Sequence, residues 1–136
     1  MRLYFFTDCP QEFRQHGAAC YLVNHNSSTF NDASNFCQER DSFLVEPRTE
    51  GQNDKVKWYR NNIVLWIGLK RDSFPLYKWL WERNEEELDE QEALWGHGEP
   101  NGGGNGQCVE LHVGGAYWND KSCGQRRQVV CQYPGK

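Results

Sequence analysis

The sequence has no excess of basic residues and no long apolar stretch. Its 15 lysines and arginines and 19 acidic residues give a formal net charge of −4, whereas a nucleic-acid binder usually carries a basic surface that releases counterions from phosphates. No apolar run approaches the ~20 residues that a membrane-spanning helix needs. The opening residues, MRLYFF, are too short for a secretory signal and suggest a mature or trimmed chain with an added methionine. We expect no nucleic-acid partner and no membrane segment in this chain.

The short motifs that mark common enzyme sites are also missing. No histidine pair has HExxH spacing, no serine lies in GxSxG, and the glycine-rich GEPNGGGNGQ lacks the GxxxxGK[ST] pattern of a phosphate-binding loop. The histidines are best interpreted as surface or hydrogen-bonded structural residues: His16, His25, His97 and His112. We therefore expect a binding protein and not an enzyme.

The length of the chain is typical of one domain. It has 136 residues, of which 14% are aromatic, and its six tryptophans can supply a single core. No repeat and no linker divides it. The prediction is one domain over residues 1–136.

Cysteine is the unusual component. The six cysteines form an even set without a CxxC pair, which favours disulfides over zinc or thioredoxin-like chemistry. Disulfides persist in oxidising surroundings, so we predict a secreted or extracellular protein. The triplet Asn26-Ser27-Ser28 fits a glycosylation site, and fits an ordinary polar loop equally well.

Hydrophobic periodicity divides the chain into a helical first half and a strand-rich second half. Residues 28–43 predict a helix that begins near Ser28 or Thr29 and carries Cys37, and a second helix is predicted from Thr49 to the Asn61-Asn62 pair. Residues 84–95 are acidic and predict a solvated loop or a turn of helix. The other predicted elements are a hairpin over 9–20 and strands over 63–70, 76–81, 108–113, 116–118 and 128–133.

Two short polar segments carry the chemistry. Glu99 and Asn101 flank a proline before a run of glycines, and Asn119 and Asp120 follow Trp118. Carboxylate and amide oxygens are the ligands of Ca²⁺, which takes six to eight of them. Each segment alone is more often a turn than a site. A bond between Cys108 and Cys123 would bring the two segments together at one end of a small sheet.

These residues resemble the C-type lectin-like domain, and within it the calcium-dependent carbohydrate-recognition domains. The resemblance covers nearly the whole chain: Trp66-Ile67-Gly68-Leu69, Trp79-Leu80-Trp81, Trp95, Glu99-Pro100-Asn101 and Trp118-Asn119-Asp120. It implies an α+β fold with two helices flanking two small antiparallel sheets and a long calcium-binding loop. It also implies a cis Glu99-Pro100 bond and the long form of the domain, with disulfides Cys9–Cys20, Cys37–Cys131 and Cys108–Cys123.

The function that this resemblance implies is a lectin for mannose-type sugars, namely mannose, glucose, N-acetylglucosamine and fucose. One Ca²⁺ ion, held by Glu99, Asn101, Asn119 and Asp120, would bind two adjacent sugar hydroxyls, which the same four side chains would also contact. The alternatives are a lectin-like domain with a protein ligand and a lectin that prefers galactose. Display of several copies, as in a homo-oligomer, would add avidity.

The chain departs from the family pattern at one position. Family members of this kind usually carry an acidic calcium ligand two residues before the cysteine that follows the long loop, and that position is Gly106 here. Either Asn105, Gln107 or a water completes the shell. With fewer charged ligands, we expect weak calcium binding, near 10⁻³ M.

Overall fold

The structure is a computed structural model that describes residues 9–49, 52, 63–73, 75–102, 107–112 and 117–134. Within these ranges the chain forms a single α-helix of more than one turn, a 3-10 helix at Glu90–Glu92 and eight strands. The α-helix is α1 (Phe30–Gln38). No helix among the described residues is long and apolar enough to cross a membrane. The strands are β1 (Arg14–His16), β2 (Ala19–Ser28), β3 (Phe43–Leu44), β4 (Val64–Arg71), β5 (Trp79–Trp81), β6 (Cys108–His112), β7 (Tyr117–Lys121) and β8 (Arg127–Gln132).

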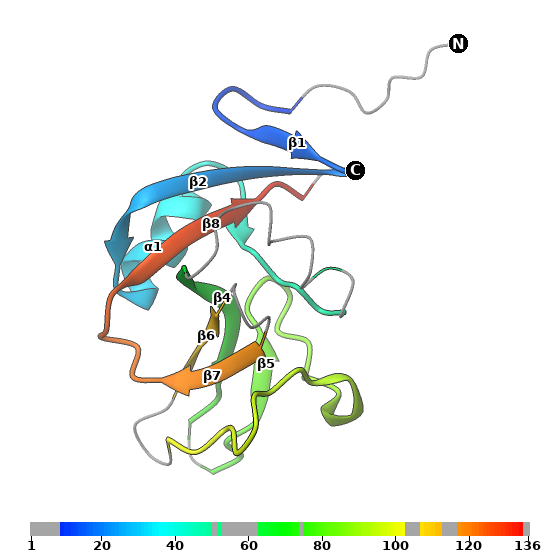
Figure 1. Ribbon diagram of the computed structural model, residues 1–136, viewed down its shortest axis with the longest axis vertical. Coiled ribbons are helices and arrows are strands. Elements are labelled where there is room, and N and C mark those ends of the chain that lie inside the picture. The colour runs from blue at the N-terminus through cyan, green and yellow to red at the C-terminus, as the bar shows by residue number, and fades with distance from the viewer. Residues whose placement is uncertain are drawn as a thin grey trace.

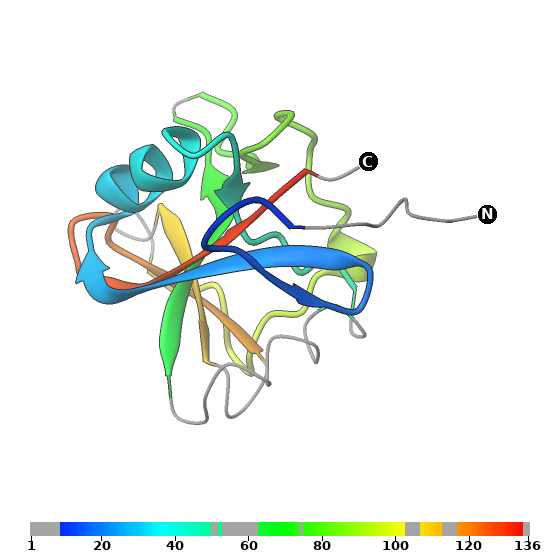
Figure 2. The ribbon, with the colours of Figure 1, turned by 90° about the horizontal axis from the view of Figure 1, so that it is seen from above.

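The strands form two antiparallel groups that share one contact. In the first group β8 pairs with β2 and β3, and β1 extends β2. In the second, β4 pairs with β5 and β6, and β7 extends β6. A single parallel pair, Leu65 with Gln128, joins β4 to β8. Figure 1 shows the first group above the second, with α1 beside β2 and β8, and Figure 2 shows β2 running across the direction of β4. The fold is therefore α+β, as predicted.

Most of the predicted elements are present. The Thr29 side chain accepts the backbone N–H of Asp32 at 3.3 Å, so Thr29 and not Ser28 is the N-cap of α1. The predicted strand over 116–118 continues to Lys121, whereas that over 76–81 begins only at Trp79. Of the second predicted helix the structure describes only Thr49 and the helical Gln52, whose backbone N–H donates to the Thr49 side chain at 3.1 Å, as expected for a helix that begins near Thr49. The other residues of this predicted helix lie outside the described chain.

The N-terminal strand pair extends further than predicted. β2 continues through Ser28, so the exposed Asn26 lies on a strand rather than in a polar loop. A shift in register between Asn24 and Ser28 lets the Asn24 side chain accept the backbone N–H of Asn26 at 3.1 Å. Residues 24–28 are all polar, so this part of β2 lacks the apolar–polar alternation that marks a strand in the sequence.

The three predicted disulfides are confirmed. Cys9 bonds Cys20 in the β1–β2 region. The Cys37–Cys131 bond ties α1 to β8, and the Cys108–Cys123 bond ties the start of β6 to the segment after β7. Cys37, Cys108 and Cys131 are fully buried in a core cluster with Phe30 and Trp66. The other core cluster lies under the segment that carries the candidate site, and its members from these strands are Leu65, Ile67 and Leu69 of β4, Val109 and Leu111 of β6 and Trp118 of β7.

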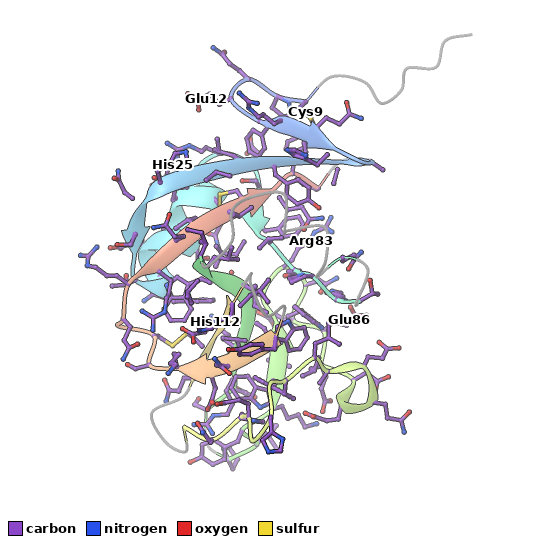
Figure 3. All side chains as sticks on the ribbon, viewed as in Figure 1. Cys9, Glu12, His25, Arg83, Glu86 and His112 are labelled. Atoms are coloured by element: carbon purple, nitrogen blue, oxygen red, sulfur yellow. A yellow bond between two sulfur atoms is a disulfide. The ribbon has the colours of Figure 1, made fainter. Side chains whose placement is uncertain are left out.

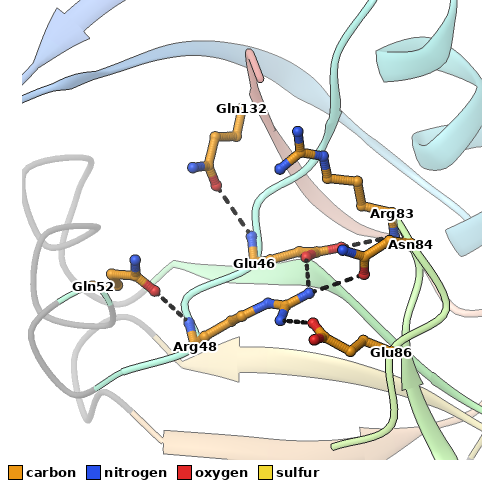
Figure 4. Close-up of polar contacts among 7 residues, drawn as sticks. All are labelled: Glu46, Arg48, Gln52, Arg83, Asn84, Glu86 and Gln132. Atoms are coloured by element: carbon orange, nitrogen blue, oxygen red, sulfur yellow. Dashed lines mark hydrogen bonds and ion pairs between the residues drawn. The ribbon is translucent and has the colours of Figure 1, made fainter. Parts of the chain in front are cut away.

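A buried carboxylate connects the two halves of the fold. Glu46, which follows β3, is 7% exposed and accepts the backbone N–H of Arg83 at 2.9 Å. Its other oxygen lies 3.1 Å from Arg48, which also binds Glu86 (Figure 4). Gly68 of β4 permits this approach, because a Cβ there would lie 3.0 Å from the Glu46 side chain. This network holds the segment after β3 against the turn after β5.

Candidate metal-binding site

Tryptophans position the segment that leads into the site. Trp95 forms a parallel bridge with Trp118 of β7, in which Trp118 donates its backbone N–H to Leu94 O at 3.0 Å and Gly96 donates to Trp118 O at 2.9 Å. The two indole rings pack edge to face with 5.6 Å between centroids, and Trp79 packs edge to face on Trp95 at 5.0 Å. Trp118 is fully buried. The segment that follows Trp95 is therefore fixed beside β7.

The turn after Trp95 brings Glu99 back toward β7. Glu99 donates its backbone N–H to Gly96 O at 2.9 Å, and Gly98 takes the left-handed backbone conformation (φ +79°) that favours glycine. The Glu99-Pro100 peptide bond is cis, as the family resemblance implied. The acidic and amide residues of the first predicted segment are thus presented on a tight turn.

Asp120 joins this turn to β7. The side chain is 4% exposed, and its two oxygens accept the backbone N–H groups of Asn101 at 2.9 Å and of Gly102 at 2.7 Å. A carboxylate has about four acceptor positions, so each oxygen keeps a lone pair after these bonds. The two predicted polar segments therefore meet, as the Cys108–Cys123 bond suggested.

Glu99 is the chemically unsatisfied member of the site. Its Oε1 atom is buried and has no hydrogen-bond partner among the described residues. Burial raises the pKa of the Glu99 carboxyl, and the neighbouring Asp120 carboxyl raises it further, while the Asp120 backbone N–H and the charge of Lys121 act in the opposite direction. A buried acceptor without a partner, beside a second carboxyl, is costly. A bound cation would satisfy the free oxygen and reduce the repulsion, so the donor set fits Ca²⁺.

The two asparagines are placed differently. The Asn101 backbone belongs to the turn, and its residue is exposed. Asn119 precedes Asp120 on β7, so its side chain leaves the opposite face of the strand. Its Nδ2 donates to Glu110 Oε2 at 3.2 Å, and its Oδ1 lies 3.2 Å from the position that a Cβ on Gly96 would take. The Asn119 oxygen therefore lies at the base of the turn that carries Glu99.

The remaining candidate ligands lie at or beyond the edge of the described chain. Asn105 and Gly106 fall outside the described residues. Gln107 is exposed, and its backbone oxygen accepts the N–H of Arg71 at 2.8 Å. In the described part of the chain no three His, Cys, Asp or Glu side chains gather in a metal-binding group. A cation at Glu99 and Asp120 would therefore depend on amide or carbonyl oxygens as well.

One residue that contacts the predicted ligand set was not among the residues predicted from the sequence. Glu110 of β6 is directly opposite Asn119 in the β6–β7 register and is only 2% exposed. Arg127 donates to its Oε1 at 2.6 Å, and His112, which Figure 3 labels beside β7, approaches its Oε2 at 3.4 Å. The signal was a single carboxylate within the otherwise apolar start of CVELHV, which is unusual for a buried strand.

Known proteins resemble this chain in sequence. The family model described as "Lectin C-type domain" matches residues 26–133. E-selectin from Equus caballus is 30% identical over 128 residues, which cover 87% of this chain and 20% of the relative. This chain thus spans about a fifth of the length of that E-selectin.

Solved structures share the fold. The cow C-type carbohydrate-recognition domain of CD23, solved in the presence of a GlcNAc2Man3 oligosaccharide, has a TM-score of 0.79 and 26% identity, with 95% of this chain and 98% of that chain covered. A calcium-independent type II antifreeze protein has a TM-score of 0.80 and 18% identity, with coverage of 95% and 96%. The chain belongs to the C-type lectin domain family. Because the fold is shared by a calcium-independent protein, the fold alone does not establish calcium binding.

Proposed function

We propose that residues 1–136 form one extracellular carbohydrate-recognition domain that binds mannose-type sugars through Ca²⁺, and that it is a binding domain and not an enzyme. The observation that carries the proposal is the free, buried Oε1 of Glu99 beside Asp120. Asp120 already holds the turn through two backbone N–H groups, so these two carboxylates are pre-positioned next to one another. Proteins rarely bury an acceptor without a partner, and a cation ligand is the simplest partner for this one.

The four proposed ligands divide the work by their chemistry. Bound Ca²⁺ would supply open coordination positions that two adjacent sugar hydroxyls can fill. Glu99 and Asp120 can accept hydrogen bonds from the sugar hydroxyl groups, because an ionised carboxylate is only a hydrogen-bond acceptor. Asn101 and Asn119 can donate amide hydrogens to the hydroxyl oxygens; Asn119 retains a second Nδ2 hydrogen beyond the one directed at Glu110. Two hydroxyls would then have all their hydrogen-bonding groups satisfied.

The missing acidic ligand limits the expected affinity. Gly106 cannot supply a side-chain oxygen, so we propose that Asn105, Gln107 or a water takes that position. A single mannose would bind with a Kd near 10⁻³ M, about −4 kcal/mol, because few contacts beyond the ion and four side chains are available. Useful binding would need several copies on one assembly, such as a homo-oligomer. The family relatives, including the domain crystallised with an oligosaccharide, support a carbohydrate ligand.

Retention on immobilised mannose in calcium, followed by elution with EDTA, tests this proposal. Elution by EDTA and by free mannose is the expected result. Retention that EDTA leaves unchanged would point to calcium-independent recognition. A protein that binds calcium but no sugar on a glycan array would favour the protein-ligand alternative.

A further inference from the structure

We infer that Glu110 is a positioning residue that fixes the Asn119 amide so that its oxygen, and not its nitrogen, faces the calcium-binding turn. This inference rests on the proposed function of the site. Among the described residues, and apart from Glu99 and Asp120 themselves, Glu110 is the one buried carboxylate that contacts a proposed calcium ligand. No direct contact of Glu110 with the ion or the sugar is needed for this role.

Burial constrains Glu110 first. A carboxylate that is 2% exposed must be paired or fully hydrogen-bonded to be tolerated. Arg127 meets this need at Oε1, with an Nε···O distance of 2.6 Å. The guanidinium is itself fixed, because its other two nitrogens donate to Gln125 Oε1 at 2.6 Å and to the Arg126 carbonyl at 2.7 Å. Glu110 is therefore held in one orientation.

The second step is the orientation of the Asn119 amide. An amide can turn either its oxygen or its nitrogen toward a neighbour, and the neighbour decides which. The Glu110 Oε2 atom is an acceptor, so it selects the Asn119 Nδ2 atom, which donates to it at 3.2 Å. The oxygen must then point away from Glu110. It lies beside Gly96, whose carbonyl accepts the backbone N–H of Glu99.

The consequence concerns the ion. Ca²⁺ binds oxygen, so an Asn119 amide in the reverse orientation would present hydrogens to the cation and oppose binding. Groups that orient metal ligands typically affect metal affinity 10–100-fold when they are removed. The chain from Arg127 through Glu110 to Asn119 thus acts on calcium without supplying a ligand beyond Asn119.

Glu110→Gln separates positioning from shape. The introduced glutamine has nearly the same volume as Glu110, and the Arg127 N–H will select its oxygen, which leaves its side-chain nitrogen facing Asn119. Asn119 must then turn its own oxygen toward that nitrogen and its amide hydrogens toward the turn. We expect calcium affinity to fall at least about tenfold. The measurement is the calcium concentration that raises the Tm of each purified variant by the same amount.

The double variant Glu110→Gln with Asn119→Asp supplies the rescue. The introduced aspartate would accept from the glutamine nitrogen with one oxygen and present the other to the turn, so calcium affinity should return to the level of the unchanged protein or above. Asn119→Asp alone places two carboxylates in contact and should lower the Tm of the calcium-free protein. A purely structural role for Glu110 would produce no such reversal.

Two controls complete the experiment. Glu46→Gln also removes a buried carboxylate held by an arginine, but in the network between β3 and the turn after β5, so calcium affinity should not change. In the calcium-free protein, NMR should show slower solvent exchange for the Asn119 side-chain amide than for that of the exposed Asn101. Fast exchange at Asn119 would overturn the inference without reference to calcium.

The outcomes distinguish this inference from the proposed function. If the unchanged protein binds calcium and Glu110→Gln binds it equally well, the positioning role is wrong while the calcium site stands. If the unchanged protein binds no calcium, both the proposed function and this inference are overturned. The inference is supported if Glu110→Gln binds calcium more weakly, if the double variant recovers the affinity, and if Glu46→Gln keeps the affinity of the unchanged protein.

Discussion

Asp120 and Asn101 lie 19 positions apart in the chain, and the Asp120 carboxylate accepts the Asn101 backbone N–H at 2.9 Å. The neighbouring oxygen accepts from Gly102 in the same way. One side chain therefore anchors the turn with both of its oxygens, and each oxygen keeps a lone pair. The shape of the turn and the charge of the site consequently depend on the same residue.

Asp120→Asn should weaken both stability and calcium binding. The substituted amide nitrogen would face a backbone N–H, which leaves buried donors unpaired at a cost of about 1–3 kcal/mol. Chemical unfolding in EDTA measures the first effect, and calcium titration measures the second. Glu92→Gln, which removes an exposed carboxylate on the 3-10 helix, should change neither. The anchoring role would be contradicted if Asp120→Asn, without calcium, unfolded with the same free energy as the unchanged protein.

Gly96→Ala should disturb the site through sterics alone. A Cβ at this position would lie 2.7 Å from the Tyr117 ring and 3.2 Å from Asn119 Oδ1, so the ring or the turn must move. We expect reduced calcium affinity and a lower Tm, each measured by thermal denaturation with and without calcium. Gly124→Ala is the matched control, because its Cβ would approach nothing closer than 4.0 Å. Equal behaviour of the two variants would show that the turn adapts freely.

Mannose should inhibit binding better than galactose. The order Glu99-Pro100-Asn101 is associated, through the family resemblance, with the equatorial 3- and 4-hydroxyls of mannose, whereas the 4-hydroxyl of galactose is axial. The sequence from Gly102 to Gly106 also has no aromatic side chain on which the apolar face of galactose could stack. Competition by the two free sugars, side by side in calcium, measures the order. Stronger inhibition by galactose would contradict this preference.

Glu46 should make the protein less stable as the pH rises. Burial raises the pKa of its carboxyl above the ordinary 4.5, although bonds from Arg83 and Arg48 oppose the rise. Because the folded state holds the proton more tightly than the unfolded state, the contribution of Glu46 is greatest below the unfolded-state pKa and is lost as the pH rises through the folded-state value.

The measurement is a difference, because other groups titrate too. We expect the free energy of unfolding of the unchanged protein, relative to Glu46→Gln, to decrease from about pH 4.5 upward. Urea unfolding in EDTA over a pH series provides both values. A difference that increases with pH would show that the arginines stabilise the charged carboxylate more than burial destabilises it.

The disulfides should differ in their contribution to stability. Cys37 and Cys131 are separated by 94 positions, and Cys9 and Cys20 by 11. In the chain-entropy model the long loop contributes about 4–5 kcal/mol and the short loop about 3 kcal/mol. Replacing the buried Cys37–Cys131 pair by alanines also opens space in the core. Guanidinium unfolding of the two double variants should show this order, and a costlier loss of Cys9–Cys20 would contradict it.

The sequence by itself was sufficient to predict the class of fold and the two polar segments that form the candidate site. Trp66-Ile67-Gly68-Leu69 and Trp118-Asn119-Asp120 are contiguous patterns, so neighbouring residues carry all of their information. The disulfide pairs also followed from the family resemblance, since the order of six cysteines along the chain is visible without coordinates. The carboxylate oxygens of Glu99 and Asp120 mark both residues as candidate ligands in the sequence, whereas only the structure shows that they are neighbours.

Tertiary structure alone decided how these residues act on one another. Glu110 and Asn119 meet because β6 and β7 pair in a register that places them opposite one another, and no pattern of neighbouring residues specifies that register. Arg127 reaches Glu110 only because β8 lies beside β4 in the same assembly of strands. The residue types of a site can be read locally, whereas the orientation of an amide depends on hydrogen-bond partners that packing brings from distant parts of the chain.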